Sequence, residues 1–177
     1  VRAGELRTAI SLLEELRNGT LQSHQIFDVD KTAKYYALST LMNCPHGKSW
    51  HNSRIYYNPV TSLLEPIGFD GNCRREGAQE ALQEYVPKCI YFSNSSDCPF
   101  EAADYSVLIL SDGIIFKKYV EEMDKMSRKE YMDNLLGKLN KEIKKEIRTI
   151  QKEKPFYHFY TDGYYSSKNQ IWEMLNP

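Results

Sequence analysis

The sequence predicts an α+β domain that is mostly α-helical and contains one short β-hairpin. Apolar residues recur at the three- and four-residue spacing of amphipathic helices over most of the chain. Residues 53–57 instead alternate between inward and outward side chains, and a turn signal, Asn58-Pro59, follows them. The chain has 177 residues, a length that suits a single domain (residues 1–177) with its own hydrophobic core.

Two helices are predicted before the hairpin. Residues 5–17 form the first, and Gly19 suits a left-handed end to it. Asp28 is predicted to cap a second helix that runs to about residue 40. The inner face of this second helix is predicted to carry Ala33, Tyr36, Ala37 and Leu41. Residues 43–50, which are rich in Pro, Gly, His and Lys, are predicted to form a loop.

The hairpin is predicted to pair residues 53–57 with residues 63–69. Ile55 and Tyr57 share one face of the first strand, and Arg54 and Tyr56 share the other. Pro66 marks the second strand as an edge strand or an irregular one.

Helices are predicted over most of the remaining chain, beginning with residues 77–85, followed by an irregular stretch over residues 87–99. Residues 112–126 form the next helix, with an inner face of Phe116, Tyr119, Val120 and Met123. Ser127 and Glu130 are predicted to form a capping box that starts the longest helix, which runs to about residue 152. Its buried stripe is predicted to be Tyr131, Leu135, Leu139, Ile143, Ile147 and Ile150. An aromatic loop, residues 156–165, and a short helix ending at Pro177 close the chain.

The two ends of the hairpin carry the residues best suited to chemistry. His51-Asn52 precedes the first strand, and Phe69-Asp70-Gly71 follows the second. The Asn52 amide and the Asp70 carboxylate both offer hard oxygen ligands to a divalent metal. Without further support, a surface hairpin that ends on a turn Asp explains the same residues, because Asp-Gly is a common turn pair.

The segment from residue 50 to residue 72 resembles the signature of the CotH kinase-like family. The residues that carry the resemblance are His51-Asn52, Tyr56-Tyr57-Asn58-Pro59 and Pro66-Ile67-Gly68-Phe69-Asp70. Residues 28–41, 127–131 and 169–177 are similar to helices of the same family, and residues 73–106 match it least.

This resemblance implies the C-lobe of an atypical protein kinase that transfers phosphate from ATP to a protein or cell-surface substrate. Asp70 and Asn52 would then hold Mg²⁺ or Mn²⁺ against the nucleotide phosphates. The resemblance also implies a cell-envelope or exported setting. The sequence contains neither GxGxxG nor GxxxxGK[ST], so we expect the nucleotide-clamping N-lobe to belong to a longer parent and this fragment to be inactive alone.

The catalytic base is harder to assign, because residues 43–50 contain no acidic side chain. His46 is the candidate base, although a solvated loop histidine is an equal reading. Lys48 is a candidate phosphate contact. Trp50 is either a stacking surface for the base of the nucleotide or a packing residue, and the sequence does not separate the two. An interaction module that has lost catalysis is therefore the alternative to an enzyme. A hydrolase using Ser49, His51 and Asp70 is a weaker possibility, because no GxSxG motif supports it.

Composition narrows the partners. The net charge of −1 gives no general attraction to nucleic acid, and no apolar run is long enough to span a membrane. The four cysteines form no CxxC motif and are predicted to be free buried thiols, with a disulfide as the minority reading for an exported protein.

Overall fold

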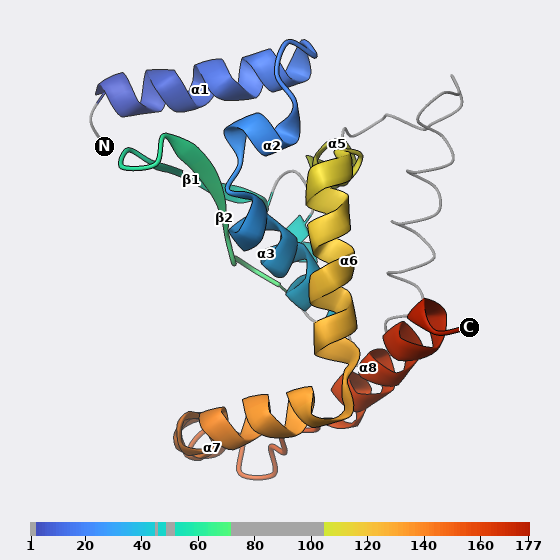
Figure 1. Cartoon of the computed structure of the whole chain (residues 1–177). Helices are drawn as coiled ribbons and strands as arrows, with labels where there is room; N and C mark the ends of the chain where they lie inside the picture. Colours follow the sequence, from blue (N-terminus) through green and yellow to red (C-terminus); the bar gives the residue numbers. More distant parts are fainter. Residues whose placement is uncertain (1–2, 45, 49–51, 72–104) are drawn as a thin grey trace.

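The computed structural model describes residues 3–44, 46–48, 52–71 and 105–177. The elements follow in the order α1 (Ala3–Arg17), α2 (Ser23–Ile26), α3 (Val29–Leu41), the 3-10 turn η1 (His46–Lys48), β1 (Arg54–Asn58), β2 (Leu63–Ile67), α5 (Tyr105–Leu110), α6 (Gly113–Ser127), α7 (Lys129–Gln151) and α8 (Asp162–Leu175). The described residues are thus mostly helical with one two-stranded antiparallel sheet, as predicted (Figure 1). The predictions for residues 77–85 and 87–99 lie outside the described residues.

Helices α3 and α6 lie side by side at the centre of the fold, and each begins at an aspartate (Figure 1). The Asp28 side chain accepts a hydrogen bond of 3.0 Å from the backbone N–H of Lys31, which confirms the predicted cap of α3. Asp112 caps α6 by accepting from the backbone N–H groups of Ile114 and Ile115, at 2.9 and 3.3 Å. The second central helix therefore begins where the sequence predicts.

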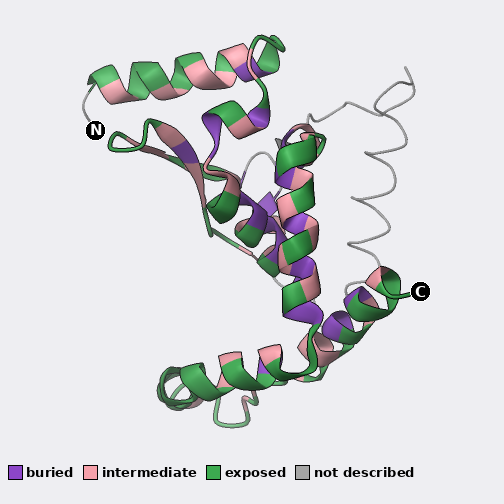
Figure 2. Cartoon of the chain, viewed as in Figure 1, coloured by how far each residue is buried: buried purple, intermediate pink, exposed green. Residues whose placement is uncertain are grey.

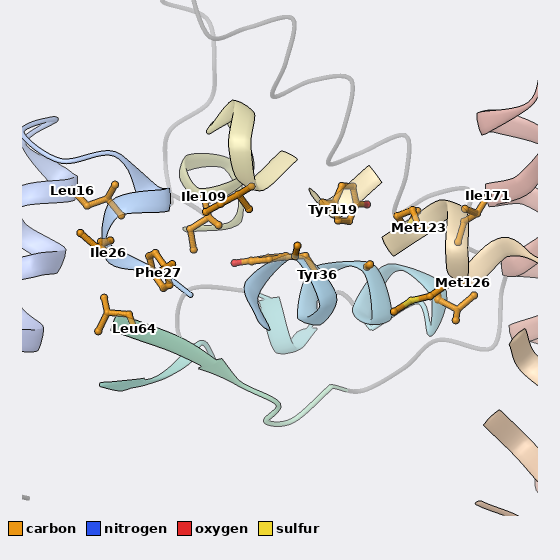
Figure 3. Close-up of a cluster of buried hydrophobic side chains, with 14 of the residues drawn as sticks. Leu16, Ile26, Phe27, Tyr36, Leu64, Ile109, Tyr119, Met123, Met126 and Ile171 are labelled. Carbon is orange, nitrogen blue, oxygen red and sulfur yellow. The ribbon is translucent and has the colours of Figure 1, made fainter. Parts of the chain in front are cut away.

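The hydrophobic core runs along α3, from Leu16 and Ile26 at one end to Ile171 of α8 at the other (Figure 3). The inner face predicted for α3 is confirmed: Ala33, Tyr36, Ala37 and Leu41 are all buried. Across the interface, the Tyr119 hydroxyl lies 3.2 Å from Thr40 Oγ1. Burial raises the pKa of Tyr119 to about 12, so this phenol stays protonated at any ordinary pH.

The hairpin packs against the start of α3 rather than standing apart from the core. Strands β1 and β2 pair with Arg54 opposite Ile67 and Tyr57 opposite Leu64. Leu64 is fully buried, and its carbonyl accepts a 2.9 Å hydrogen bond from the backbone N–H of Asp28. Ile55 and Tyr57 share one face as predicted, and this is the inner face, since both are half-buried and pack on the core. This hydrogen bond between the start of α3 and β2 therefore fixes the position of the hairpin relative to α3.

Helix α7 differs from its prediction in burial. Its range matches, but Met132 is the one residue of α7 that is fully buried. Leu139 and Ile150 of the predicted buried stripe are 43% and 38% exposed. Figure 2 shows that α7 turns away from α3 and α6, so its far half lies away from the core that those two helices form. Apolar spacing indicated the correct face but not whether a partner element lies against it.

Two local predictions were wrong. Ser127 ends α6 instead of capping α7, and its hydroxyl donates to the Asp124 carbonyl at 2.8 Å, so the capping box with Glu130 does not form. The aromatic loop is shorter than predicted, because α8 begins at Asp162. Helices α2 and α5 were not predicted at all. Within the described part of the chain, no helix is long and apolar enough to cross a membrane.

Candidate functional site

The open end of the hairpin brings together the residues that precede β1 and follow β2. Because Arg54 pairs with Ile67 in an antiparallel register, Asn52 and Asp70 both lie at this end of the sheet. The 3-10 turn η1, which holds His46, Gly47 and Lys48, lies against the same end. The hairpin predicted from the sequence thus places its two candidate metal ligands in one neighbourhood.

His46 contacts both candidate ligands. Its Nδ1 atom lies 2.8 Å from Asn52 Nδ2, and its carbonyl accepts from the same amide at 3.3 Å. The same Nδ1 atom lies 3.2 Å from the Asp70 carbonyl oxygen and 3.3 Å from Asp70 Oδ2. His46 therefore lies between an amide six residues away and a carboxylate 24 residues away, and its Nδ1 atom either accepts from the amide or, where it carries a hydrogen, donates to Asp70.

Close backbone packing holds η1 against residues 68–71. A Cβ atom on Gly47 would meet the Phe69 carbonyl oxygen at 2.9 Å, a distance that only glycine allows. The Tyr35 hydroxyl donates to the Gly47 carbonyl at 2.9 Å and ties η1 to α3. Asp70 itself has a φ of 42°, in the left-handed region that non-glycine residues seldom occupy. The site is therefore built by a tight approach of two backbone segments.

The side chains of the site differ in exposure. Asn52 is buried at 8% exposure, whereas the His46 and Asp70 side chains are 42% and 49% exposed. The imidazole and the carboxylate are thus open to a ligand, while the amide is held in place beneath them. Because the Asp70 carboxylate is half exposed, its interaction with a protonated His46 is screened by water.

The structure does not test the predicted nucleotide contacts of Lys48 and Trp50. Lys48 is buried at 4% exposure, and its carbonyl accepts from the hydroxyls of Ser53 and Ser106, each at 3.3 Å. A phosphate contact by Lys48 stays a prediction. Trp50 lies outside the described residues, as do Ser49 and His51, so the stacking surface and the hydrolase arrangement stay predictions as well.

The donor set suits a hard divalent cation that brings further ligands with it. Asp70 and Asn52 offer carboxylate and amide oxygens, the ligand types that Mg²⁺ and Mn²⁺ prefer. Among the described residues, no group of three or more His, Cys, Asp or Glu side chains lies together to hold a metal unaided. A carboxylate and an amide supply two ligands, so a metal at this site would need its remaining ligands from water or phosphate oxygens.

The prediction of free thiols is wrong for Cys44, which is disulfide-bonded and lies two residues before His46. The other cysteines of the chain lie outside the described residues. Sequence spacing carries no signal for this bond, because the chain shows no motif that selects one pairing over another. The central position of His46 was also missed, since a lone loop histidine gives no indication of contacts across the hairpin.

Comparisons with known proteins do not assign this chain to a family. No protein-family model matches the chain, and neither a curated protein nor a solved structure shows a significant match.

Proposed function

We propose that this chain is the C-lobe-like part of an atypical kinase of the CotH kinase-like type. In this proposal Asn52 and Asp70 hold Mg²⁺ or Mn²⁺ against ATP, and phosphate passes to a protein or cell-surface acceptor. One observation carries the proposal. Asn52 and Asp70 flank the hairpin in the sequence, and both contact His46 at the open end of the hairpin. The resemblance of residues 50–72 to the signature of the CotH kinase-like family supplies the reaction class.

Each residue has a role that its burial allows. The half-exposed Asp70 carboxylate would neutralise charge at the transferring phosphoryl group, the main task of a protein in this chemistry. The buried Asn52 amide would complete the metal site from a fixed position. His46 would accept the proton of the acceptor hydroxyl, because its imidazole is half-exposed and borders the carboxylate.

The disulfide at Cys44 supports an exported or cell-envelope setting for this activity. Disulfides persist in oxidising compartments and are rare where glutathione and thioredoxin keep thiols reduced. The bond also lies beside the site, because Cys44 and Asp70 line the same cavity. Export would place the acceptor at the cell surface or beyond it.

A catalytically inactive interaction module is the second candidate, and a specific observation favours it. No acid lies in residues 43–50, and His46 occupies the place between the two candidate ligands through direct contacts to both. These contacts require no metal, so they would stabilise the loop equally well in a scaffold. The two candidates differ in whether metal and nucleotide bind at Asp70.

Binding of Mn²⁺ together with a non-hydrolysable ATP analogue separates these candidates. Mn²⁺ is paramagnetic and broadens the NMR signals of nearby amides, so the spectrum reports where the ion binds. We expect broadening at residues 46–48 and 68–71, and at least a tenfold weaker apparent affinity in Asp70→Asn. Asp30→Asn is the matched control, because it removes an exposed carboxylate from α3. Equal broadening in wild type and Asp70→Asn, or broadening elsewhere only, would refute the kinase proposal in favour of the interaction module.

A further inference from the structure

The outer part of α7 and the loop after it form an exposed surface that the proposed function does not use. The contacts of α7 with the core come from its first two turns, at Tyr131, Met132, Leu135 and Leu136. Beyond these turns, Leu139 and Ile150 are 43% and 38% exposed, and Figure 2 shows this part of α7 lying away from the core. We refer to residues 138–160 as the α7 surface.

The apolar side chains of the α7 surface form a stripe along the helix. Leu139, Ile143, Ile147 and Ile150 follow one another at spacings of four, four and three residues, which keeps them on one face. Exposed aromatic residues continue into the loop, where Phe156 is 91% exposed and Tyr160 is 58% exposed. Aromatic side chains of this kind are enriched where proteins meet the interface of a membrane.

The polar residues of the α7 surface are mainly basic. Residues 138–154 contain seven Lys and Arg residues and three Glu residues, a net charge of +4, whereas the whole chain carries −1. All seven basic residues are exposed. Among the described residues, one ion pair lies within this stretch, Lys145 with Glu146 at 3.9 Å, and its two side chains are 79% and 65% exposed. The positive charge of this surface therefore faces water and complements an anionic partner.

A second copy of the chain fits this stripe less well than an anionic surface does. In a coiled coil whose seam contained Leu139, Ile143 and Ile150, the heptad spacing would also place Glu146 in the seam. The charged residues that flank such a seam would be Asp133 and Glu142, which are both acidic and would not pair with each other. Nucleic acid would attract the basic residues but would leave the apolar stripe in water.

We infer that the α7 surface binds bilayers that contain anionic phospholipids, with α7 lying in the plane of the interface. A helix with an apolar stripe and a polar face rich in Lys and Arg binds membranes in this way. The stripe enters the boundary between headgroups and acyl chains, and the long basic side chains reach the anionic headgroups through their flexible stems. This inference is independent of the kinase proposal, because residues 138–160 contribute no group to the site around His46.

Co-sedimentation of the chain with vesicles tests the apolar stripe. We expect binding to vesicles of equal parts phosphatidylglycerol and phosphatidylcholine, and an affinity weaker by about tenfold or more for phosphatidylcholine alone. Leu139→Glu should weaken binding to the anionic vesicles by about tenfold or more, because it places a charge within the stripe. Leu6→Glu is the matched control, because it makes the same change at a leucine of α1 that is 53% exposed, against 43% for Leu139.

A second pair of variants tests the basic residues. Lys141→Gln combined with Lys144→Gln should weaken binding to the anionic vesicles by about tenfold or more. Lys34→Gln combined with Lys117→Gln is the matched control, because it removes the same charge from exposed positions on α3 and α6. Circular dichroism of each variant confirms that its helices are intact.

Three results would overturn the inference. The first is the absence of binding to the anionic vesicles, and the second is an equal effect of the two variants in either matched pair. The third is dimerisation in analytical ultracentrifugation that Leu139→Glu abolishes while vesicle binding stays unchanged, which would assign the stripe to a second copy of the chain.

Discussion

Gly47→Ala should separate η1 from residues 68–71 while leaving every side chain of the candidate site in the sequence. The new Cβ atom would lie 2.9 Å from the Phe69 carbonyl oxygen, whereas ordinary contacts begin at 3.4 Å, so the two segments must separate by about 0.5 Å. His46 Nδ1 lies 3.2 and 3.3 Å from its two Asp70 oxygens. An added 0.5 Å therefore takes both contacts past the range of a hydrogen bond. Because the obstacle is backbone, we expect a loss of about 1–3 kcal/mol in unfolding free energy.

Urea unfolding followed by circular dichroism measures this loss, and NMR signals of His46 and Asp70 report the separation of the segments. Two glycines serve as controls. Nothing lies within 4 Å of a Cβ at Gly68, two residues before Asp70, so Gly68→Ala should stay close to wild type. Gly137→Ala lies in open space within α7 and should stabilise by about 0.5–1 kcal/mol. If Gly47→Ala unfolds like Gly68→Ala and keeps the His46 signals unchanged, the tight approach that builds the site is refuted.

Three further predictions concern the central helices. Asp112→Ala should lose about 3 kcal/mol, because this carboxylate is 5% exposed and bonds α2 as well as capping α6. Asp28→Ala should lose about 1 kcal/mol, because Asp28 caps α3 and its other side-chain contact is a 3.7 Å ion pair with the exposed Lys31. Equal losses in urea unfolding would contradict this difference. Burial alone would raise the pKa of Asp112, but hydrogen bonds from the His24 backbone and ring, and from the N–H groups that open α6, lower it. Its stabilisation is thus full above about pH 4 and is lost as the pH falls through the lowered pKa, so Asp112→Asn should show a flatter acid-unfolding curve. Tyr119→Phe should lose no more than about 1 kcal/mol, because Thr40 Oγ1 keeps its 2.9 Å bond to a helix carbonyl, and a loss above about 2 kcal/mol would show that the Tyr119 hydroxyl has a larger role.

The sequence predicted the elements whose signals are local. Asp28 offers an N-cap oxygen, and the strand before Asn58 alternates in burial, so both elements follow from a few neighbouring residues. The capping box at Ser127 failed because tertiary packing decided otherwise. Met126 is fully buried, which extends α6 through Ser127 and leaves that hydroxyl to bond its own helix.

The candidate site was predictable in its ligands but not in its assembly. Asn52 and Asp70 follow from the hairpin, since antiparallel strands bring their outer ends together. The contact between His46 and Asp70 spans 24 residues and depends on the close approach at Gly47, which no local pattern encodes. The prediction of a buried stripe along all of α7 failed for the same reason. Apolar spacing identifies one face of a helix, but it does not show whether another element packs against that face.

The positive φ angle of Asp70 raises the question of why this position holds an aspartate rather than a glycine. Its φ of 42° lies where glycine is free of strain, and glycine would serve a purely structural turn better. An aspartate there accepts backbone strain and presents a half-exposed carboxylate to His46. Aspartate is one of the non-glycine residues that tolerate this region, so the turn alone explains Asp70 unless its charge has a role of its own. Asp70→Asn tests this argument cleanly, because asparagine tolerates the same left-handed backbone while losing the charge. A variant that keeps the fold but loses the Mn²⁺ effect would show that the charge accounts for the strain.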